Sequence, residues 1–179
     1  MNARLNLKNL LQLSTIFAIA FALKSFYSTA SVNDLRWILA PTASLVELIT
    51  STHLEFESQA GYISSDHTFL IAASCAGVNF LIISFLMLSL AEFSRKGHIA
   101  WRVIPFAALA SYAATLTANT VRIVIALWMH DEKLTTAWLD ADGLHRLEGI
   151  VVYFGFLVLL FFARERAAMR KFGHVKYLL

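Results

Sequence analysis

Long apolar runs separated by short polar segments dominate this chain. Residues 68–91 carry no charge, and residues 103–129 carry only one, Arg122. About 20 apolar helical residues cross the hydrocarbon core of a bilayer, so each run predicts a transmembrane helix. The uncharged run 149–163 would rise only roughly 22 Å as a helix, short of the ~30 Å core. Its helix is therefore expected to begin earlier, near His145.

The first apolar run, 10–29, follows a basic start and contains Lys24. A basic start, a short apolar stretch and small residues at 28–30 also form the pattern of a cleavable signal peptide. We favour a retained helix, because Lys24 and two aromatic residues lie where a cleavage region is usually small and polar. Lys24 would then extend its ammonium group to the interface. The expected spans are about 10–29, 68–91, 103–129 and 145–163.

The segment 31–67 contains no clear span. A helix is expected near 35–50, but Pro41 and Glu47 interrupt its apolar face. Because about 15 residues are short for a crossing, we expect an interfacial or re-entrant helix. Residues 61–67 are expected to form a polar turn before the second span.

The composition agrees with a membrane protein. Apolar residues make up 58% of the 179 residues, charged residues make up 15%, and the mean hydropathy is +0.63. Soluble domains are nearer 45–50% apolar and about 25% charged. We therefore expect a single all-α transmembrane domain over 1–179, embedded in the lipid bilayer. The net charge of +3 is no sign of nucleic-acid binding, because the basic residues lie beside the apolar runs.

The distribution of charge predicts the orientation. Ten of the fifteen basic residues lie in the segments 1–9, 92–102 and 164–179. The alternate segments, 30–67 and 130–148, hold ten of the twelve acidic residues. Basic segments stay on the cytoplasmic side of a membrane. Four spans with both termini in the cytoplasm satisfy this rule.

Cys75 is the only cysteine of the chain. A lone thiol forms no internal disulfide, and it excludes a metal site built from two or four cysteines. We expect no metal and no cofactor. Cys75 is therefore either a small buried residue that packs between membrane helices or a reactive group.

Arg122 is the strongest single indication of a functional site. A charge within a span costs about a few kcal/mol or more, so it faces protein or water and marks a functional site by default. The alternative is an arginine whose side chain extends to the outer interface. Asn119 lies three residues earlier on the same helix face. It is expected either in a cavity wall or in a hydrogen bond between helices.

The topology brings three side chains together. The second span descends from the outer side and the third returns to it, so Cys75 and Arg122 each lie roughly 11 Å below the outer surface. His145 opens the fourth span just above them, although alone it would be an ordinary interfacial histidine. Gly77 permits close approach of the backbone two residues after Cys75.

These side chains have a coherent use in peptide chemistry. Cys75 would attack a peptide carbonyl as a thiolate, activated by His145 and by the charge of Arg122. Arg122, with Asn119, would stabilise the oxyanion of the tetrahedral intermediate. His145 would then protonate the leaving amine. Water would resolve the acyl-enzyme in a protease and an amine in a transpeptidase, and the sequence leaves both open.

Three motifs resemble the exosortase and archaeosortase family. They are Ser74-Cys75-Ala76-Gly77 in one span, Asn119-Thr120-Val121-Arg122-Ile123 in the next, and His145 at the opening of the last. The compact size and Cys75-Ala76-Gly77-Val78-Asn79-Phe80 resemble the short branch called exosortase K. Leu39-Ala40-Pro41-Thr42-Ala43 is also similar to a segment of that family. The likeness covers about residues 35–160, and many relatives carry Ser where this chain has Ala76.

The resemblance implies a function. It implies that Cys75, Arg122 and His145 are the catalytic residues of a cysteine transpeptidase in the bacterial cytoplasmic membrane, with its active site on the outer side. Its substrates would be exported proteins with a C-terminal sorting signal, which consists of a short motif, a membrane helix and a basic tail.

Two other classes remain as alternatives. A non-catalytic membrane assembly factor would tolerate Cys75→Ser and Arg122→Lys. A haem-binding four-helix electron carrier would use His67, His130 and His145, which cluster near the outer face. It would, however, lack histidine pairs at matching depth on two facing spans.

Overall fold

The computed structural model describes residues 7–96, 100–131 and 141–175. The elements follow one another along the chain as α1 (Leu7–Thr29), α2 (Arg36–Thr50), β1 (Leu54–Glu57), β2 (Gly61–Ser64), β3 (Leu70–Ile71), the short 3-10 helix η1 (Ala73–Ala76), α3 (Val78–Lys96), α4 (Val103–Asp131) and α5 (Ala141–Val175).

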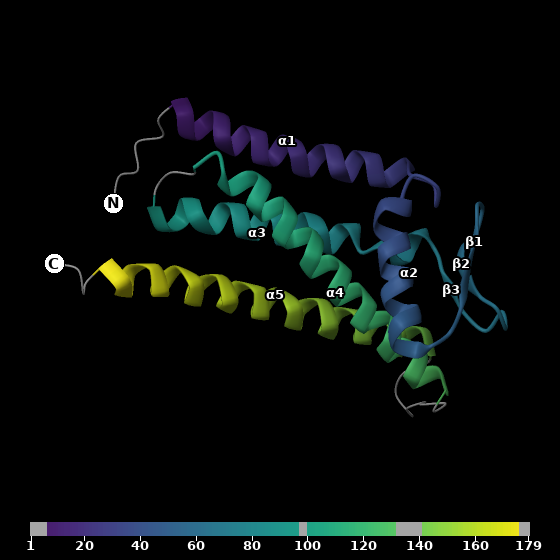
Figure 1. Cartoon of the computed structure of the whole chain (residues 1–179). Coiled ribbons are helices and arrows are strands. Elements are labelled where there is room, and N and C mark those ends of the chain that lie inside the picture. Colours follow the sequence, from purple (N-terminus) through teal and green to yellow (C-terminus); the bar gives the residue numbers. More distant parts are fainter. Residues whose placement is uncertain (1–6, 97–99, 132–140, 176–179) are drawn as a thin grey trace.

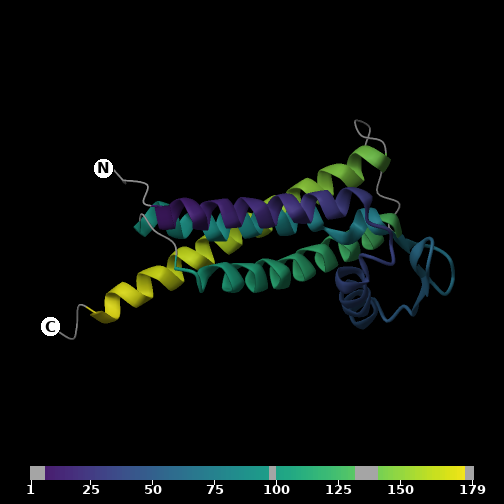
Figure 2. The same ribbon diagram turned by 90° about the horizontal axis from the view of Figure 1, so that it is seen from above.

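Four helices form a bundle that is suited to a membrane. Within the described residues, α1, α3, α4 and α5 each contain a segment long and apolar enough to cross a bilayer. α3 packs against α1 and α4, and α5 packs against α4 and α3. α1 and α3 run side by side in both views, whereas α5 runs obliquely to them in Figure 2. The start of α1 and the end of α5 lie at one end, and α2 and the strands lie at the other, in both Figure 1 and Figure 2. The predicted class, a helical membrane protein with four spans and a shorter helix near 35–50, is confirmed.

Apolar side chains fill the contact between α1, α3 and α4. Ile16 of α1 belongs to one buried cluster with Phe85 and Leu88 of α3 and with Ile104 and Ala107 of α4. Large apolar side chains on the outward faces of the same helices stay exposed. This arrangement suits a bundle whose outer surface is covered by lipid.

A proline explains how α2 is attached to the bundle. Pro41 has no N–H group, so the Trp37 carbonyl four residues earlier lacks its usual helical donor. Tyr112 of α4 supplies that bond, because its hydroxyl donates to the Trp37 carbonyl oxygen at 2.7 Å. The rings of Tyr112 and Trp37 also stack, with centroids 5.8 Å apart. Pro41, expected only to interrupt the apolar face, thus marks the place where α2 binds α4.

A three-stranded antiparallel sheet in the order β1-β2-β3 follows α2. In β1, Leu54 and Phe56 alternate with two glutamates, which is the period of a strand with one covered face. The Glu47 carboxylate of α2 accepts a hydrogen bond from the Leu54 N–H at 2.7 Å and joins the sheet to that helix. The prediction of a polar turn at 61–67 was wrong for its first four residues, which form β2.

The second predicted span, 68–91, is not one continuous helix. Its first residues form β3 and η1, and α3 begins only at Val78. Gly77 ends η1 with φ of 68°, in the left-handed region that favours glycine. An uncharged run predicts burial but does not by itself distinguish a strand or turn from a helix. Here the run begins in the sheet and ends in the bundle.

α5 continues beyond the predicted limits of the fourth span, 145–163. The charges at Arg164 and Glu165 were expected to end the span, but the helix runs through them. Arg164 donates a hydrogen bond to Glu92 of α3 at 3.0 Å and another to Glu165. These pairs satisfy the charges at the end of the bundle that lies away from the sheet.

Gly61 is the residue on which the sheet geometry depends most directly. Its φ is 132°, and a Cβ at this position would lie 2.2 Å from the Ile71 carbonyl oxygen. We predict that Gly61→Ala destabilises the protein by about 1–3 kcal/mol, because the backbone conformation suits glycine alone. Thermal unfolding of the purified protein in detergent measures this loss.

Gly155→Ala is the matched control, because a Cβ there meets nothing within 4 Å. It should leave the unfolding temperature unchanged or slightly higher, since alanine favours a helix over glycine. Equal losses in the two variants would contradict the prediction.

Candidate functional site

Cys75 lies on a tight turn between a strand and a helix. η1 follows β3 after one residue, and the Cys75 N–H donates to the Ala72 carbonyl oxygen at 2.9 Å. Gly77 then directs the chain into α3. The thiol is half-buried and forms no disulfide. A side chain on such a turn is held near a helix N-terminus, where backbone N–H groups stabilise negative charge.

Asn119 of α4 is hydrogen-bonded to the backbone of this turn. Its side chain is fully buried, and its Nδ2 donates a hydrogen bond to the Cys75 carbonyl oxygen. Its Oδ1 accepts a hydrogen bond from the Tyr153 hydroxyl of α5 at 2.8 Å. The Tyr153 ring stacks on Phe80 of α3, with centroids 5.0 Å apart. One amide therefore connects η1, α4 and α5.

Gly77 allows η1 to come this close to its partners. A Cβ at Gly77 would lie 3.2 Å from Thr115 Cγ2, 3.3 Å from Tyr153 Oη and 3.4 Å from Asn119 Cγ. Contacts of this length leave little room for a larger residue. The close backbone approach expected at Gly77 is the one that the structure has.

Arg122 lies three residues after Asn119, and its side chain is only 15% exposed. Its Nε lies 3.8 Å from Oε2 of Glu148 on α5, whose side chain is 5% exposed. Its Cζ lies 5.6 Å from the centroid of the Tyr153 ring. A Cβ at Gly149 would lie 2.8 Å from Arg122 Nε, so glycine at this position provides the space for the guanidinium. The Glu148 carboxylate and the face of the Tyr153 ring thus orient the Arg122 guanidinium.

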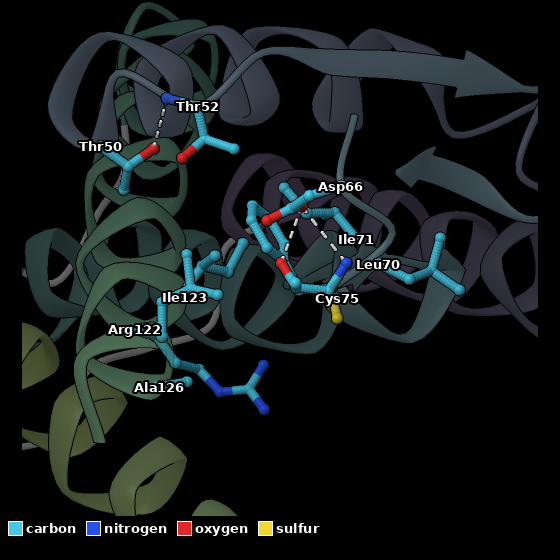
Figure 3. A pocket seen from close by; sticks show the side chains of 12 residues that line it. Thr50, Thr52, Asp66, Leu70, Ile71, Cys75, Arg122, Ile123 and Ala126 are labelled. Atoms are coloured by element: carbon cyan, nitrogen blue, oxygen red, sulfur yellow. Dashed lines mark hydrogen bonds between the residues drawn. The ribbon is translucent and has the colours of Figure 1, made fainter. Parts of the chain in front are cut away.

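Cys75 and Arg122 line the same cavity, which has a volume of about 470 Å³. The cavity lies where the sheet and the end of α2 meet η1 and α4, and Figure 3 shows Arg122 extending from α4 toward the side on which the Cys75 sulfur lies. The other lining residues include four polar ones, Thr50, Thr52, Asp66 and Thr68, and six apolar ones, Phe69, Leu70, Ile71, Ile123, Ala126 and Leu127.

Asp66 brings a carboxylate to the cavity from the sheet side. It accepts hydrogen bonds from the Thr68 hydroxyl at 2.9 Å and from the Thr68 N–H at 3.3 Å. Hydrogen bonds from the Ser64 and Thr68 side chains lower the pKa of Asp66 below its usual range, so the carboxylate is ionised at neutral pH. The cavity therefore has a negative group on the sheet and a positive group, Arg122, on the bundle.

The structure places most of the residues predicted from the sequence in one region. Cys75 and Arg122 face the cavity, and Asn119 and Gly77 support the turn behind the thiol. Of the two alternatives for Asn119, the observed one is a hydrogen bond between elements, made to the carbonyl of the cysteine itself. His145 belongs to the backbone of α5, but its side chain lies outside the described part of the structure, as does that of His130.

Three residues of the site were missed from the sequence: Asp66, Gly149 and Tyr153. Gly149 and Tyr153 are four residues apart and so share a helix face. Within an uncharged span, however, a tyrosine is not distinguished from an aromatic residue that faces lipid. The sequence places Asp66 in a polar turn, and only the fold brings it to the cavity that Cys75 lines.

Neither metal chemistry nor known relatives add to this description. Among residues 7–96, 100–131 and 141–175, no group of three or more His, Cys, Asp and Glu side chains is arranged to hold a metal ion. Comparison with protein-family models, curated proteins and solved structures finds no match for the chain. Function is therefore inferred from the geometry of the cavity.

We predict that Asn119→Leu destabilises the protein, because it removes the hydrogen bonds that the amide makes to the Cys75 carbonyl and to the Tyr153 hydroxyl. A part-buried polar group that loses its partner costs about 1–3 kcal/mol. Tyr153→Phe removes only one of the two bonds and should cost less. Unfolding of both variants in detergent measures the difference, and an Asn119→Leu protein as stable as the parent would contradict the assigned hydrogen bonds.

Proposed function

We propose that this protein is a membrane-embedded cysteine protease or transpeptidase of the exosortase type, which cleaves C-terminal sorting signals of exported surface proteins. One observation carries the proposal. The only cysteine and an arginine 47 positions later, on different elements, line one cavity at one end of the bundle. Both side chains are therefore accessible to a ligand that enters this cavity.

The reaction begins with attack of the Cys75 thiolate on the carbonyl carbon of the scissile peptide bond. The new C–S bond forms as the carbonyl oxygen takes up negative charge, and the Arg122 guanidinium stabilises that oxyanion. The C–N bond then breaks, and the leaving amine takes a proton from the His145 imidazolium. Water or an acceptor amine releases the acyl group from the thioester, and the thiolate leaves.

The residues around Arg122 and Cys75 have positioning roles in this mechanism. Glu148 and the Tyr153 ring hold the guanidinium, and Gly149 leaves room for it. Asn119 fixes the carbonyl of Cys75 and so the turn that presents the thiol. His145 lies four residues before Gly149 on α5, and residues four apart in a helix lie on the same face.

The charge distribution supports an outer location for the cavity. Lys8 near the start of α1 and Arg166 near the end of α5 lie at the end of the bundle opposite to the cavity, whereas Asp34, Glu55 and Asp66 lie on the cavity side. The positive end is retained in the cytoplasm. The cavity would then face the outer side of a bacterial cytoplasmic membrane, where exported proteins arrive.

Replacement of the thiol tests the proposal. Cys75→Ala should abolish processing of a co-expressed exported protein that ends in a short motif, an apolar helix and a basic tail, because no acyl-enzyme can form. Ser74→Ala, at the exposed neighbouring position of η1, is the matched control and should retain processing. Immunoblotting of the membrane fraction reports both insertion and processing. Normal processing by an inserted Cys75→Ala protein would rule the proposal out.

Replacement of the Arg122 guanidinium distinguishes a catalytic protein from a non-catalytic assembly factor. We predict that Arg122→Gln lowers the rate of processing by roughly 10²–10³, as loss of an oxyanion donor does. Arg122→Lys, which keeps the charge but not the planar geometry, should fall between that variant and the parent. Arg36→Gln is the control, since this guanidinium lies over the Phe56 ring at 4.3 Å and does not line the cavity. A non-catalytic assembly factor would tolerate all three changes.

A further inference from the structure

The open edge of the sheet lies in the wall of the cavity. β3 is the last strand in the order β1-β2-β3, and within residues 7–96, 100–131 and 141–175 no further strand pairs with it. Both of its residues, Leu70 and Ile71, line the cavity. β3 also leads directly into η1, so this edge is separated from Cys75 by only a few residues of chain.

The register shows which backbone groups point to this edge. The Ser64 N–H donates to the Phe69 carbonyl oxygen at 3.1 Å, so this pair is joined by the ladder. In an antiparallel ladder, hydrogen-bonded and non-hydrogen-bonded pairs alternate. The next pair, Ile63 with Leu70, is therefore non-hydrogen-bonded. The N–H and C=O groups of Leu70 consequently point away from β2, toward the open edge.

We propose that the peptide substrate binds in an extended conformation as an additional strand along β3, with one of its residues hydrogen-bonded to the N–H and C=O of Leu70. This inference rests on the proposed function and specifies how the same cavity holds its substrate. An edge strand presents an unpaired row of backbone groups, and an extended peptide that joins it gains main-chain hydrogen bonds whatever its side chains.

The surroundings of the edge suit such a peptide. Leu70 is 45% exposed and offers an apolar contact to one side chain, whereas Ile71 is buried. Asp66 and Arg122, on opposite sides of the cavity, flank the path with charges of opposite sign. Main-chain pairing at β3 would place the following peptide bond toward Cys75 and Arg122, so binding and cleavage share one continuous surface.

Peptide reagents test the binding mode directly on the full-length protein in detergent. The probes are capped alanine–leucine pentapeptides that end in a chloromethyl ketone, from which the Cys75 sulfur displaces chloride. Each probe of the set is N-methylated at a different backbone amide, so that each lacks a single N–H. Mass spectrometry follows the modification, and Cys75 is the only thiol that can react.

The expected result is one sensitive amide, the one whose N–H faces the Leu70 carbonyl oxygen. Methylation of an amide that faces β3 should slow modification roughly tenfold, the scale of one lost hydrogen bond, whereas methylation of its neighbours should change the rate little. Iodoacetamide, which has no peptide backbone, gives the intrinsic reactivity of the thiol. A flat methylation scan, or a pentapeptide no faster than a single-residue chloromethyl ketone, overturns the proposal.

A pair of variants at one position gives a second test. Leu70→Pro removes the outward N–H but no hydrogen bond of the β2–β3 ladder, so the sheet should keep its pairing. It should slow the pentapeptide reagent roughly tenfold and leave the iodoacetamide rate unchanged. Leu70→Ala keeps the N–H and should keep the single methylation-sensitive amide.

The two proposals fail in different ways. A protein that processes its substrate without Cys75 lacks the proposed function. A protein whose processing needs Cys75 but whose reagents show no methylation-sensitive amide has the function without the added strand.

Discussion

The buried amide of Asn119 is the constraint on which the candidate site depends. A membrane-spanning segment normally satisfies its backbone within a helix, and non-helical backbone is tolerated only where protein or a water-filled cavity surrounds it. The apolar segment that begins at Ala73 opens with a 3-10 turn instead. The Asn119 amide donates a hydrogen bond to the Cys75 carbonyl of this turn, and the Tyr153 hydroxyl donates one to the oxygen of the same amide. The turn that carries the thiol exists because a side chain from α4 completes its hydrogen bonding.

Two glycines on different elements make the space for this arrangement. Gly77 lets the turn approach α4 and α5, and Gly149 leaves the volume that the Arg122 guanidinium occupies. Protein interiors are close-packed, so a side chain at either position would have to displace the group beside it. The positions of the polar groups therefore depend on the space left at these two glycines as well as on hydrogen bonds.

The sequence predicted the helical bundle better than the three-stranded sheet and η1. Uncharged length and the sign of flanking charges are strong signals, and α1 and α4 begin and end close to where these signals place them. The run 68–91 was different, because a strand, a turn and a helix with the same apolar composition look alike and only Gly77 indicated a break. The alternation in Leu54–Glu57 was visible but short. For the site, the expectation that Cys75 and Arg122 lie near each other agrees with the cavity that both line, but the helical depth assumed for Cys75 was wrong, because a strand and a 3-10 turn precede α3. Tyr153 and Asp66 required the packing of α5 and the fold of the sheet.

The helical bundle and the sheet can contribute different groups to a binding site: the helices present side chains, and the sheet edge presents unpaired main-chain groups. A membrane helix has its backbone groups already bonded, so it can present side chains to a peptide but few main-chain partners. A strand edge has the opposite property, since its unpaired N–H and C=O groups recognise any extended chain. In this protein α4 supplies the guanidinium, the sheet supplies the open edge beside Leu70, and Cys75 lies on the turn that joins the sheet to α3. In the proposed function, the position of the thiol at that junction, rather than its depth in a helix, would let one cavity both hold a peptide and act on it.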